Sequence, residues 1–215
     1  SFNNRWIDFI PTEGKRSGAY STGGAYDVHP YILMNWNDDY ESLSTLAHEL
    51  GHTMHSFYSN ANQPFAKADY ATFVAEIAST INETLLNNYM VKNAKNDDEK
   101  LFLLGSYLDL LRTTIFRQTS FAEFELQIHK RVEEGQPLTG DDLCNIYYDI
   151  VKKYYGHDAG HCVVDPYIQY EWSYIPHFMG YTYYVFQYST SLIYATAFAE
   201  KIVTEGNPAV DNFYK

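Results

Sequence analysis

The chain has 215 residues, of which 15 are Lys or Arg and 27 are Asp or Glu, giving a formal net charge of −12. Such a length can bury a sizeable core and fits one domain or one part of a larger protein. The acidic balance argues against nucleic acid or an anionic membrane as a partner.

The first predicted elements are a glycine-rich loop and a small β-hairpin. The loop is rich in Gly, Ser and Asn and ends on Gly23 and Gly24, where the backbone could come close to a bound segment such as an extended peptide. An ordinary turn is the alternative, and the glycine pair by itself favours it. Residues 31–36 predict a short buried strand, so we expect a hairpin from about Ala19 to Trp36.

The next segment contains the sequence His48-Glu49-Leu50-Gly51-His52. Two histidines four residues apart on a helix project from one face and can bind one metal ion, with the glutamate beside them. This His-Glu-x-x-His pattern is typical of zinc hydrolases. Short motifs also recur by chance, and the alternative is a solvent-facing helix that happens to carry histidines.

The context of the motif predicts a helix. Capping groups precede it at Asp38, Asp39 and Ser42. An apolar stripe repeats at spacings of four and three residues and consists of Leu43, Ala47, Leu50, Met54 and Phe57. His48, His52 and His55 form a second stripe of their own. Gly51 in a helix interior costs about 1 kcal/mol relative to Ala, which the close approach of another backbone or a substrate would explain.

A second helix is predicted from about residue 69 to residue 93, after a break at residues 59–67. Its apolar stripe consists of Phe73, Val74, Ile77, Ile81 and Leu85. A polar face lies off this stripe and is formed by Glu76, Ser79, Thr80 and Glu83. This face could turn toward the histidines if the two helices are antiparallel.

The motif needs a third metal ligand, because a catalytic zinc takes three protein ligands and keeps a fourth position for water. His55 is two helical turns from His48, too far along the axis to share its ion, so we expect it to line the pocket or support a ligand. Glu76 follows His52 by 24 residues, enough for an antiparallel return, and is the expected ligand. Glu83 would orient a liganding imidazole. Exposed glutamates are the alternative for both.

Glu49 completes the expected chemistry. Zinc lowers the pKa of its bound water toward about 7, and a nearby carboxylate can take the proton as the water attacks a carbonyl carbon. The oxyanion that results needs hydrogen-bond donors. Candidates at the head of the last predicted helix are His177, Tyr181, Tyr183 and Tyr184. Simple aromatic packing is the favoured explanation for at least two of these four.

The remainder of the chain is predicted to be helical. A periodic segment covers residues 97–134 with a break near Thr119 and Ser120. A helix at residues 141–155, an irregular segment, and a last helix at residues 181–204 follow. We therefore expect a mainly α fold, a helical zincin-like catalytic domain with a small β-hairpin before the motif helix, and residues 1–215 as a single domain.

The expected compartment is the cytoplasm. Cys144 and Cys162 form no disulfide framework and no Cys-x-x-Cys pair, which favours a reducing setting. Residues 1–6 do not resemble a signal peptide. Residues 178–199 carry no charge and are long enough to span a membrane. Their hydroxyls, Gln187 and many tyrosines favour a buried helix instead.

Residues 48–55, followed by residues 69–76, resemble the thimet oligopeptidase and oligoendopeptidase F family of zinc metallopeptidases. Further segments are most similar to its oligoendopeptidase F branch, namely residues 15–20, 30–36, 117–125 and 175–188. The resemblance implies a mainly helical fold with a deep channel and hydrolysis of short peptides in the cytosol. It assigns one zinc ion to His48, His52 and Glu76 and the general base to Glu49. It places substrate-binding and oxyanion-stabilising groups at His177 and the tyrosines after it.

Two features depart from that family. Its members usually carry Tyr where Phe186 stands, so one hydroxyl contact is either missing or supplied by Tyr183 or Tyr184. They are also much longer, with a helical N-terminal portion that forms the opposite channel wall. The chain therefore resembles the catalytic C-terminal part of a longer enzyme, and that missing N-terminal portion is an expected partner.

The leading hypothesis is a zinc-dependent endopeptidase for short oligopeptides, with zinc-bound water activated by Glu49. A fragment that binds zinc and peptide without competent catalysis is the alternative, because the missing portion would have held the substrate in place. A di-iron carboxylate bundle is a weaker hypothesis, since it needs a second Glu-x-x-His pair and Glu125 and His129 are spaced by four. The same N and O ligands also accept cobalt or manganese.

Overall fold

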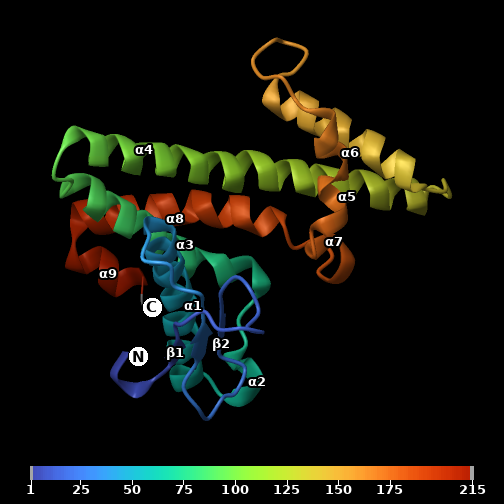
Figure 1. Cartoon of the computed structure of the whole chain (residues 1–215). Coiled ribbons are helices and arrows are strands. Elements are labelled where there is room, and N and C mark those ends of the chain that lie inside the picture. Colours follow the sequence, from blue (N-terminus) through green and yellow to red (C-terminus); the bar gives the residue numbers. More distant parts are fainter. Residues whose placement is uncertain (1, 214–215) are drawn as a thin grey trace. The chain divides into compact units, whose positions relative to one another are not determined.

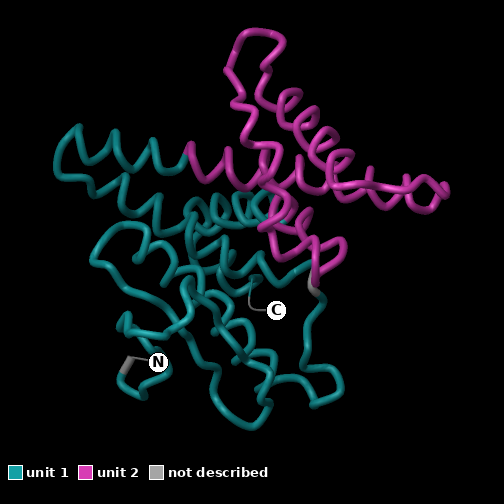
Figure 2. The backbone as a smooth tube through the Cα atoms, turned by 45° about the vertical axis from the view of Figure 1, so that its right-hand side comes forward, with its two compact units in different colours: residues 1–107, 191–215 teal, residues 108–190 magenta. Residues whose placement is uncertain are grey.

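The computed structural model describes residues 2–213 (Figure 1). They divide into two compact units, one made of residues 2–107 and 191–213 and the other of residues 108–190 (Figure 2). That residues 1–215 act as a single catalytic domain stays a prediction. Within residues 2–213, every helix is too short or too polar to cross a membrane.

A three-stranded sheet opens the first unit, with the strand order β1-β3-β2. β2 (Tyr20–Thr22) pairs antiparallel with β3 (Tyr31–Leu33), which confirms the predicted hairpin. β1 (Ile7–Asp8) pairs parallel with β3 and was missed, because two residues carry no readable alternation. Ile32 and Met34 are buried and pack against Leu46 of the next helix, which fixes the sheet to that helix.

The helix that carries the motif, α1, and the second predicted helix, α3, lie side by side (Figure 1). α1 (Tyr40–Asn62) carries the His-Glu-x-x-His sequence, and α3 (Thr72–Lys92) follows the short α2 (Phe65–Ala68). The N-terminus of α1 is capped as predicted, since Asp39 Oδ1 accepts a hydrogen bond from the Ser42 N–H at 2.7 Å.

The buried faces of α1 and α3 are largely polar, so the predicted apolar stripes describe them only in part, as at Ile81, which is 1% exposed. Met54 and Phe57 of the α1 stripe are 37% and 38% exposed, and Phe73 of the α3 stripe is 43% exposed. The buried residues of α1 are instead Ser42, Leu46, Glu49, Gly51, Thr53 and Ser56. Those of α3 include Glu76, Ser79, Thr80, Ile81, Thr84 and Asn87. Short hydroxyl side chains tolerate this burial because they are hydrogen-bonded.

Specific hydrogen bonds stabilise these polar faces. Thr53 Oγ1 lies 2.8 Å from Ser21 Oγ of β2. Thr80 Oγ1 donates to the Glu76 backbone oxygen at 2.6 Å. Asn82 Nδ2 donates to the Ala47 backbone oxygen at 3.2 Å and so joins α3 to α1. The polar face predicted for α3 is therefore its contact face with α1.

Further helices lie wholly or partly in the first unit. α4 (Asp97–Leu111) begins where the sequence predicted, but α8 (Phe186–Glu205) begins five residues later than Tyr181. α9 (Asn207–Phe213) follows Gly206, where only a helix stop was expected. Pro208 lies in the first turn of α9, where proline is tolerated because no N–H is needed there.

The second unit is built around α5 (Gln118–Glu133) and α6 (Gly140–Tyr155). A π-helical turn at Arg112–Arg117 precedes α5, so the irregularity lies earlier than the predicted break at Thr119 and Ser120. The core joins both helices through Phe121, Phe124 and Tyr147. η3 (Pro166–Tyr174) and α7 (His177–Gly180) occupy the segment expected to be irregular. The chain is thus mainly α, as predicted.

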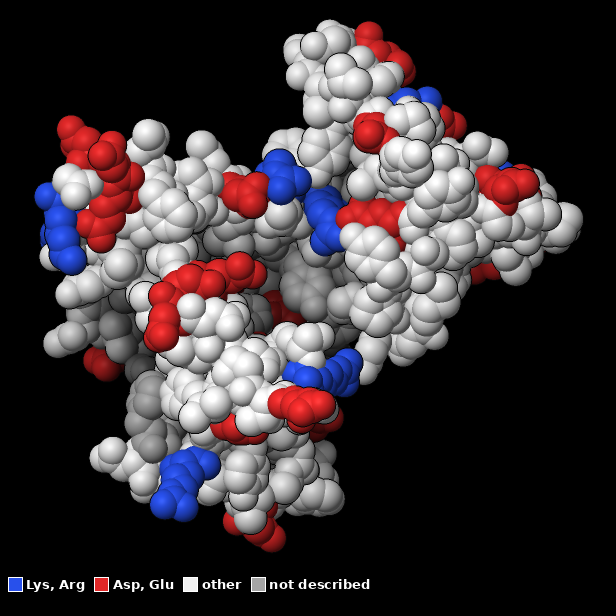
Figure 3. Space-filling model, in the orientation of Figure 1, with Lys and Arg blue, Asp and Glu red and all other residues white. Residues whose placement is uncertain are grey.

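Charged side chains are spread over the surface. On the face seen in Figure 3, Lys and Arg occur in small separate groups, and acidic side chains lie next to most of them. Lys15 pairs with Asp8 at 3.1 Å. Lys153 pairs with Glu123 at 2.9 Å. The absence of nucleic acid among the partners stays a prediction from the net charge of −12.

Candidate metal centre

Three side chains from α1 and α3 converge in the first unit. The Nε2 atoms of His48 and His52 lie 3.1 Å apart, one helical turn from each other on α1. Glu76 Oε2 of α3 lies 3.3 Å from His48 Nε2 and 3.2 Å from His52 Nε2. Among the described residues these three form the group of ligand atoms that could hold a metal ion.

The spacing of these atoms fits zinc. Ligand atoms about 2.0–2.1 Å from a tetrahedral ion lie about 3.3 Å from one another. The three separations, 3.1, 3.2 and 3.3 Å, agree with this geometry. Two imidazoles and one carboxylate form a donor set typical of catalytic zinc sites. The residues present are therefore suitable ligands for zinc.

Glu83 lies on the other side of the His48 ring. Its Oε2 is 3.0 Å from His48 Nδ1, and its Oε1 accepts a hydrogen bond from Ser44 Oγ at 3.4 Å. Burial lowers the pKa of His48, but hydrogen bonds and charges from Glu76 and Glu83 outweigh it and raise this pKa to about 10. Glu83 orients the ring so that Nε2 points to the cluster. A bound cation would displace the proton that Nε2 otherwise holds.

Glu76 is held ionised in a buried position. The residue is only 4% exposed. Burial raises its pKa, but hydrogen bonds from His48 and His52 outweigh this and bring the pKa below its ordinary value. Ser79 Oγ donates to Glu76 Oε2 at 3.0 Å. Ser79 was expected on the same face as Glu76, but this hydrogen bond was not predicted, although the spacing of three residues could have indicated it.

Glu49 is a buried carboxylate with a vacant acceptor. It is 6% exposed, and its Oε2 has no hydrogen-bond partner among the described residues. Burial raises the pKa of Glu49 above its ordinary value, against the opposing charges of His48 and His52. A buried acceptor of this kind requires an explanation, and a general base that receives its proton from water or substrate supplies one.

Gly51 allows the close approach of α3 to α1. A Cβ atom at this position would lie 2.5 Å from the Ala78 backbone oxygen and 2.5 Å from Ser79 Cα. The approaching backbone that was expected to explain this glycine is thus that of α3. Because Glu76 stands on the same stretch of α3, this contact sets how near its carboxylate comes to the histidines.

Replacing Gly51 with alanine is expected to destabilise the chain and weaken zinc binding. Overpacking costs about 1–3 kcal/mol, which exceeds the gain of about 1 kcal/mol from better helix propensity. Gly105 of α4 is the matched control, because a Cβ there meets nothing within 4 Å and Gly105→Ala should stabilise slightly. Denaturant unfolding and zinc titration measure both effects. Equal stabilisation by the two substitutions would contradict the packing argument.

The other residues predicted for the first unit lie outside the ligand cluster. His55 stacks on Tyr70, with ring centroids 3.7 Å apart, and lines a cavity of about 680 Å³ beside α1 and α3. A Cβ at Gly23 would collide with the Ser56 side chain, so packing against α1 already requires this glycine. A Cβ at Gly24 would meet open space. Substrate binding by either glycine stays a prediction.

The second unit gathers most of the predicted aromatic group. His177 of α7 stacks on Tyr184 at a centroid distance of 5.5 Å and lies 5.9 Å from Tyr181. Tyr188 joins them with its hydroxyl 3.3 Å from His177 Nε2. Tyr183 packs instead against His129 of α5 at 4.9 Å. Tyr188 was not predicted, although its spacing of seven residues from Tyr181 and four from Tyr184 could have indicated it.

Comparison with known proteins connects this geometry to a family. The profile of peptidase family M3 matches residues 1–215. The chain belongs to peptidase family M3. Oligopeptidase PepF of Bacillus subtilis is 49% identical over 210 residues, which cover 98% of this M3 chain and 31% of PepF. Group B oligopeptidase PepB of Streptococcus agalactiae is also 49% identical, over 97% of this chain and 34% of PepB.

A solved M3 structure shows the same relationship. Oligoendopeptidase-F from Enterococcus faecium is 40% identical, with a TM-score of 0.63, over 80% of this chain and 30% of that one. These similarities confirm the resemblance to the oligoendopeptidase F branch. The M3 chain spans about a third of the length of these relatives, as 31%, 34% and 30% of their chains are covered.

Proposed function

We propose that this chain is the metal-binding catalytic part of a zinc-dependent endopeptidase that hydrolyses short oligopeptides. The observation that carries the proposal is the convergence of His48, His52 and Glu76 within 3.3 Å of one another, in a chain of peptidase family M3. The names oligopeptidase and oligoendopeptidase F, borne by its relatives, support short peptides as the substrate class.

The donor set suits hydrolysis. Bound zinc supplies a Lewis acid that polarises the peptide carbonyl and makes water acidic enough to lose a proton near neutral pH. Two neutral imidazoles and one carboxylate from Glu76 offset only part of a divalent charge, so the ion keeps this acidity. Glu83 holds the His48 ring in place through Nδ1.

Glu49 acts in this proposal as the general base. Its unpartnered Oε2 accepts the proton of the attacking water, and the same proton can pass to the amine that leaves. A pKa raised by burial brings the carboxylate closer to the operating pH, which favours proton transfer in both directions. His177 and Tyr184 as oxyanion donors, and Tyr181 and Tyr183 in substrate binding, stay predictions.

A fragment that binds zinc and peptide without catalysis is the second candidate. It is favoured by the observation that the chain covers only 31% of PepF. The portion present in longer relatives would then be the partner that completes substrate positioning. The cytoplasmic location likewise stays a prediction.

Cleavage of a quenched fluorescent peptide by the purified chain tests the proposal. We expect cleavage that is abolished by a chelator and restored by about one equivalent of zinc per chain. Magnesium is the control, because it prefers oxygen ligands and should not restore activity. Zinc and peptide binding without cleavage would support the second candidate. Failure to bind zinc would contradict both.

A further inference from the structure

The turn between α7 and α8 contains a residue in an unfavourable backbone conformation. Tyr183 has a φ of 56°, in the left-handed region that glycine and asparagine adopt more readily than bulky residues. The turn is short, because α7 ends at Gly180 and α8 begins at Phe186. Such a conformation persists only where neighbouring groups hold it.

A buried carboxylate of α5 provides that hold. Glu125 is 3% exposed, and its Oε1 accepts the backbone N–H of Tyr183 at 2.6 Å. His129, one helical turn further along α5, packs against the Tyr183 ring at 4.9 Å. Glu125 therefore holds the backbone of Tyr183, and His129 packs against its side chain.

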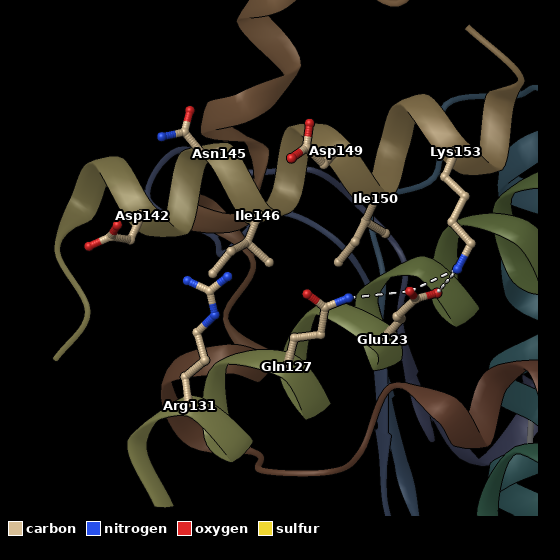
Figure 4. Close-up of a pocket in the computed structure, with 9 residues that line it drawn as sticks. All are labelled: Glu123, Gln127, Arg131, Asp142, Asn145, Ile146, Asp149, Ile150 and Lys153. Carbon is tan, nitrogen blue, oxygen red and sulfur yellow. Dashed lines mark hydrogen bonds and ion pairs between the residues drawn. The ribbon is translucent and has the colours of Figure 1, made fainter. Parts of the chain in front are cut away.

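α5 is itself firmly fixed within the second unit. Phe121 and Phe124 are 1% and 0% exposed and pack with Tyr147 of α6. Glu123 also joins the two helices, since Lys153 Nζ of α6 lies 2.9 and 3.1 Å from its carboxylate oxygens (Figure 4). A side chain on a helix held in this way can position a turn accurately.

The turn contains Tyr181 and Tyr184, whose rings lie next to the ring of His177. Tyr184 follows Tyr183 directly, and its N–H donates to the Tyr181 backbone oxygen at 3.2 Å. Its ring then stacks on His177 with an interplanar angle of 24°. A rotation of the backbone at Tyr183 would redirect Tyr184 away from this stack.

We propose that Glu125 is a positioning residue, whose carboxylate holds the left-handed turn at Tyr183 and thereby keeps Tyr184 against His177. The effect of Glu125 on peptide hydrolysis rests on the proposed function. The hydrogen bond that holds the turn does not depend on that function. This assignment accounts for a buried carboxylate that the metal centre does not use.

Hydrogen exchange in the full chain tests the hold. Glu125→Ala removes the acceptor, and Glu125→Asp shortens it, so both should speed exchange at Tyr183 by about tenfold or more. Glu125→Gln keeps a carbonyl oxygen at the same reach and should restore most of the protection. Glu123→Ala is the matched control, because it breaks the bond to Lys153 but leaves Tyr183 untouched. Unchanged exchange in the Asp and Ala variants would overturn the proposal.

Steady-state kinetics test the positioning role. We expect Glu125→Ala and Glu125→Asp to lower kcat by about tenfold or more while KM and zinc content stay near those of the wild type. Glu125→Gln should recover most of kcat. A loosened turn with unchanged kcat would overturn the positioning role. A wild-type chain without cleavage counts against the proposed function alone, because exchange still decides whether Glu125 holds the turn.

Discussion

Replacing His52 with alanine should reduce bound zinc from about one ion per chain to a small fraction of that value. The substitution removes one of three protein ligands, and losses of mere supporting groups already cost about 10–100-fold in affinity. The remaining pair, His48 and Glu76, could then hold the ion only weakly. Elemental analysis after dialysis against buffered micromolar zinc measures the loss.

His55→Ala is the matched control for this experiment. It removes a histidine from the same helix, three residues further on, whose ring stacks on Tyr70 and which is outside the ligand group. This variant should retain its zinc. Full occupancy in His52→Ala, or an equal loss in His55→Ala, would contradict the ligand assignment.

Replacing Glu49 with glutamine should lower kcat/KM by about 10²–10⁴-fold, the range that general base catalysis contributes. Glutamine preserves the size of the side chain but accepts no proton. Because Glu49 is outside the ligand group, zinc content should not change. Cleavage of a quenched fluorescent peptide, with zinc measured in the same samples, gives both values.

The outcomes of this comparison separate the hypotheses. Equal rates for the wild type and Glu49→Gln would eliminate the proposed base. No cleavage by either, with zinc bound to both, would favour the chain as a zinc- and peptide-binding fragment. Reduced zinc in the variant would instead mean that Glu49 supports the metal site.

Local sequence signals were enough to predict that His48, His52 and Glu76 lie together, because the contact follows from short-range geometry. That they bind zinc stays a prediction. A helix places His48 and His52 on one face, whatever else it contacts. The antiparallel return of the chain then leaves a narrow choice of carboxylates, of which Glu76 and Glu83 both reach the histidines. The predicted helix cap at Asp39 is equally local.

The orientation of the helices could not be predicted in the same way. Hydrophobic periodicity assumes that an apolar stripe faces the core, whereas α1 and α3 meet where Gly51 lies against Ser79 and bury polar groups such as Thr53 and Thr80. Burial of these groups depends on partners that lie far along the chain, such as Ser21 for Thr53. A periodic pattern shows which residues share a face of a helix, but it does not show which element packs against that face.

The predicted start of the helix at residues 181–204, which is α8 in the structure, was wrong for a related reason. Residues 181–185 read as a continuation of helix, and no local signal marks the left-handed Tyr183. Its conformation is held by Glu125, 58 residues earlier. Likewise, β1 exists because Ile7 pairs with Ile32. Long-range contacts of this kind are invisible to residue propensities.

Anomalous diffraction at the zinc absorption edge, from crystals of the zinc-loaded chain, tests the central claim most directly. We predict one peak about 2.0–2.2 Å from His48 Nε2, His52 Nε2 and Glu76 Oε2. A zinc peak held by other residues, or one bound by the two histidines with Glu76 turned away, would contradict the account.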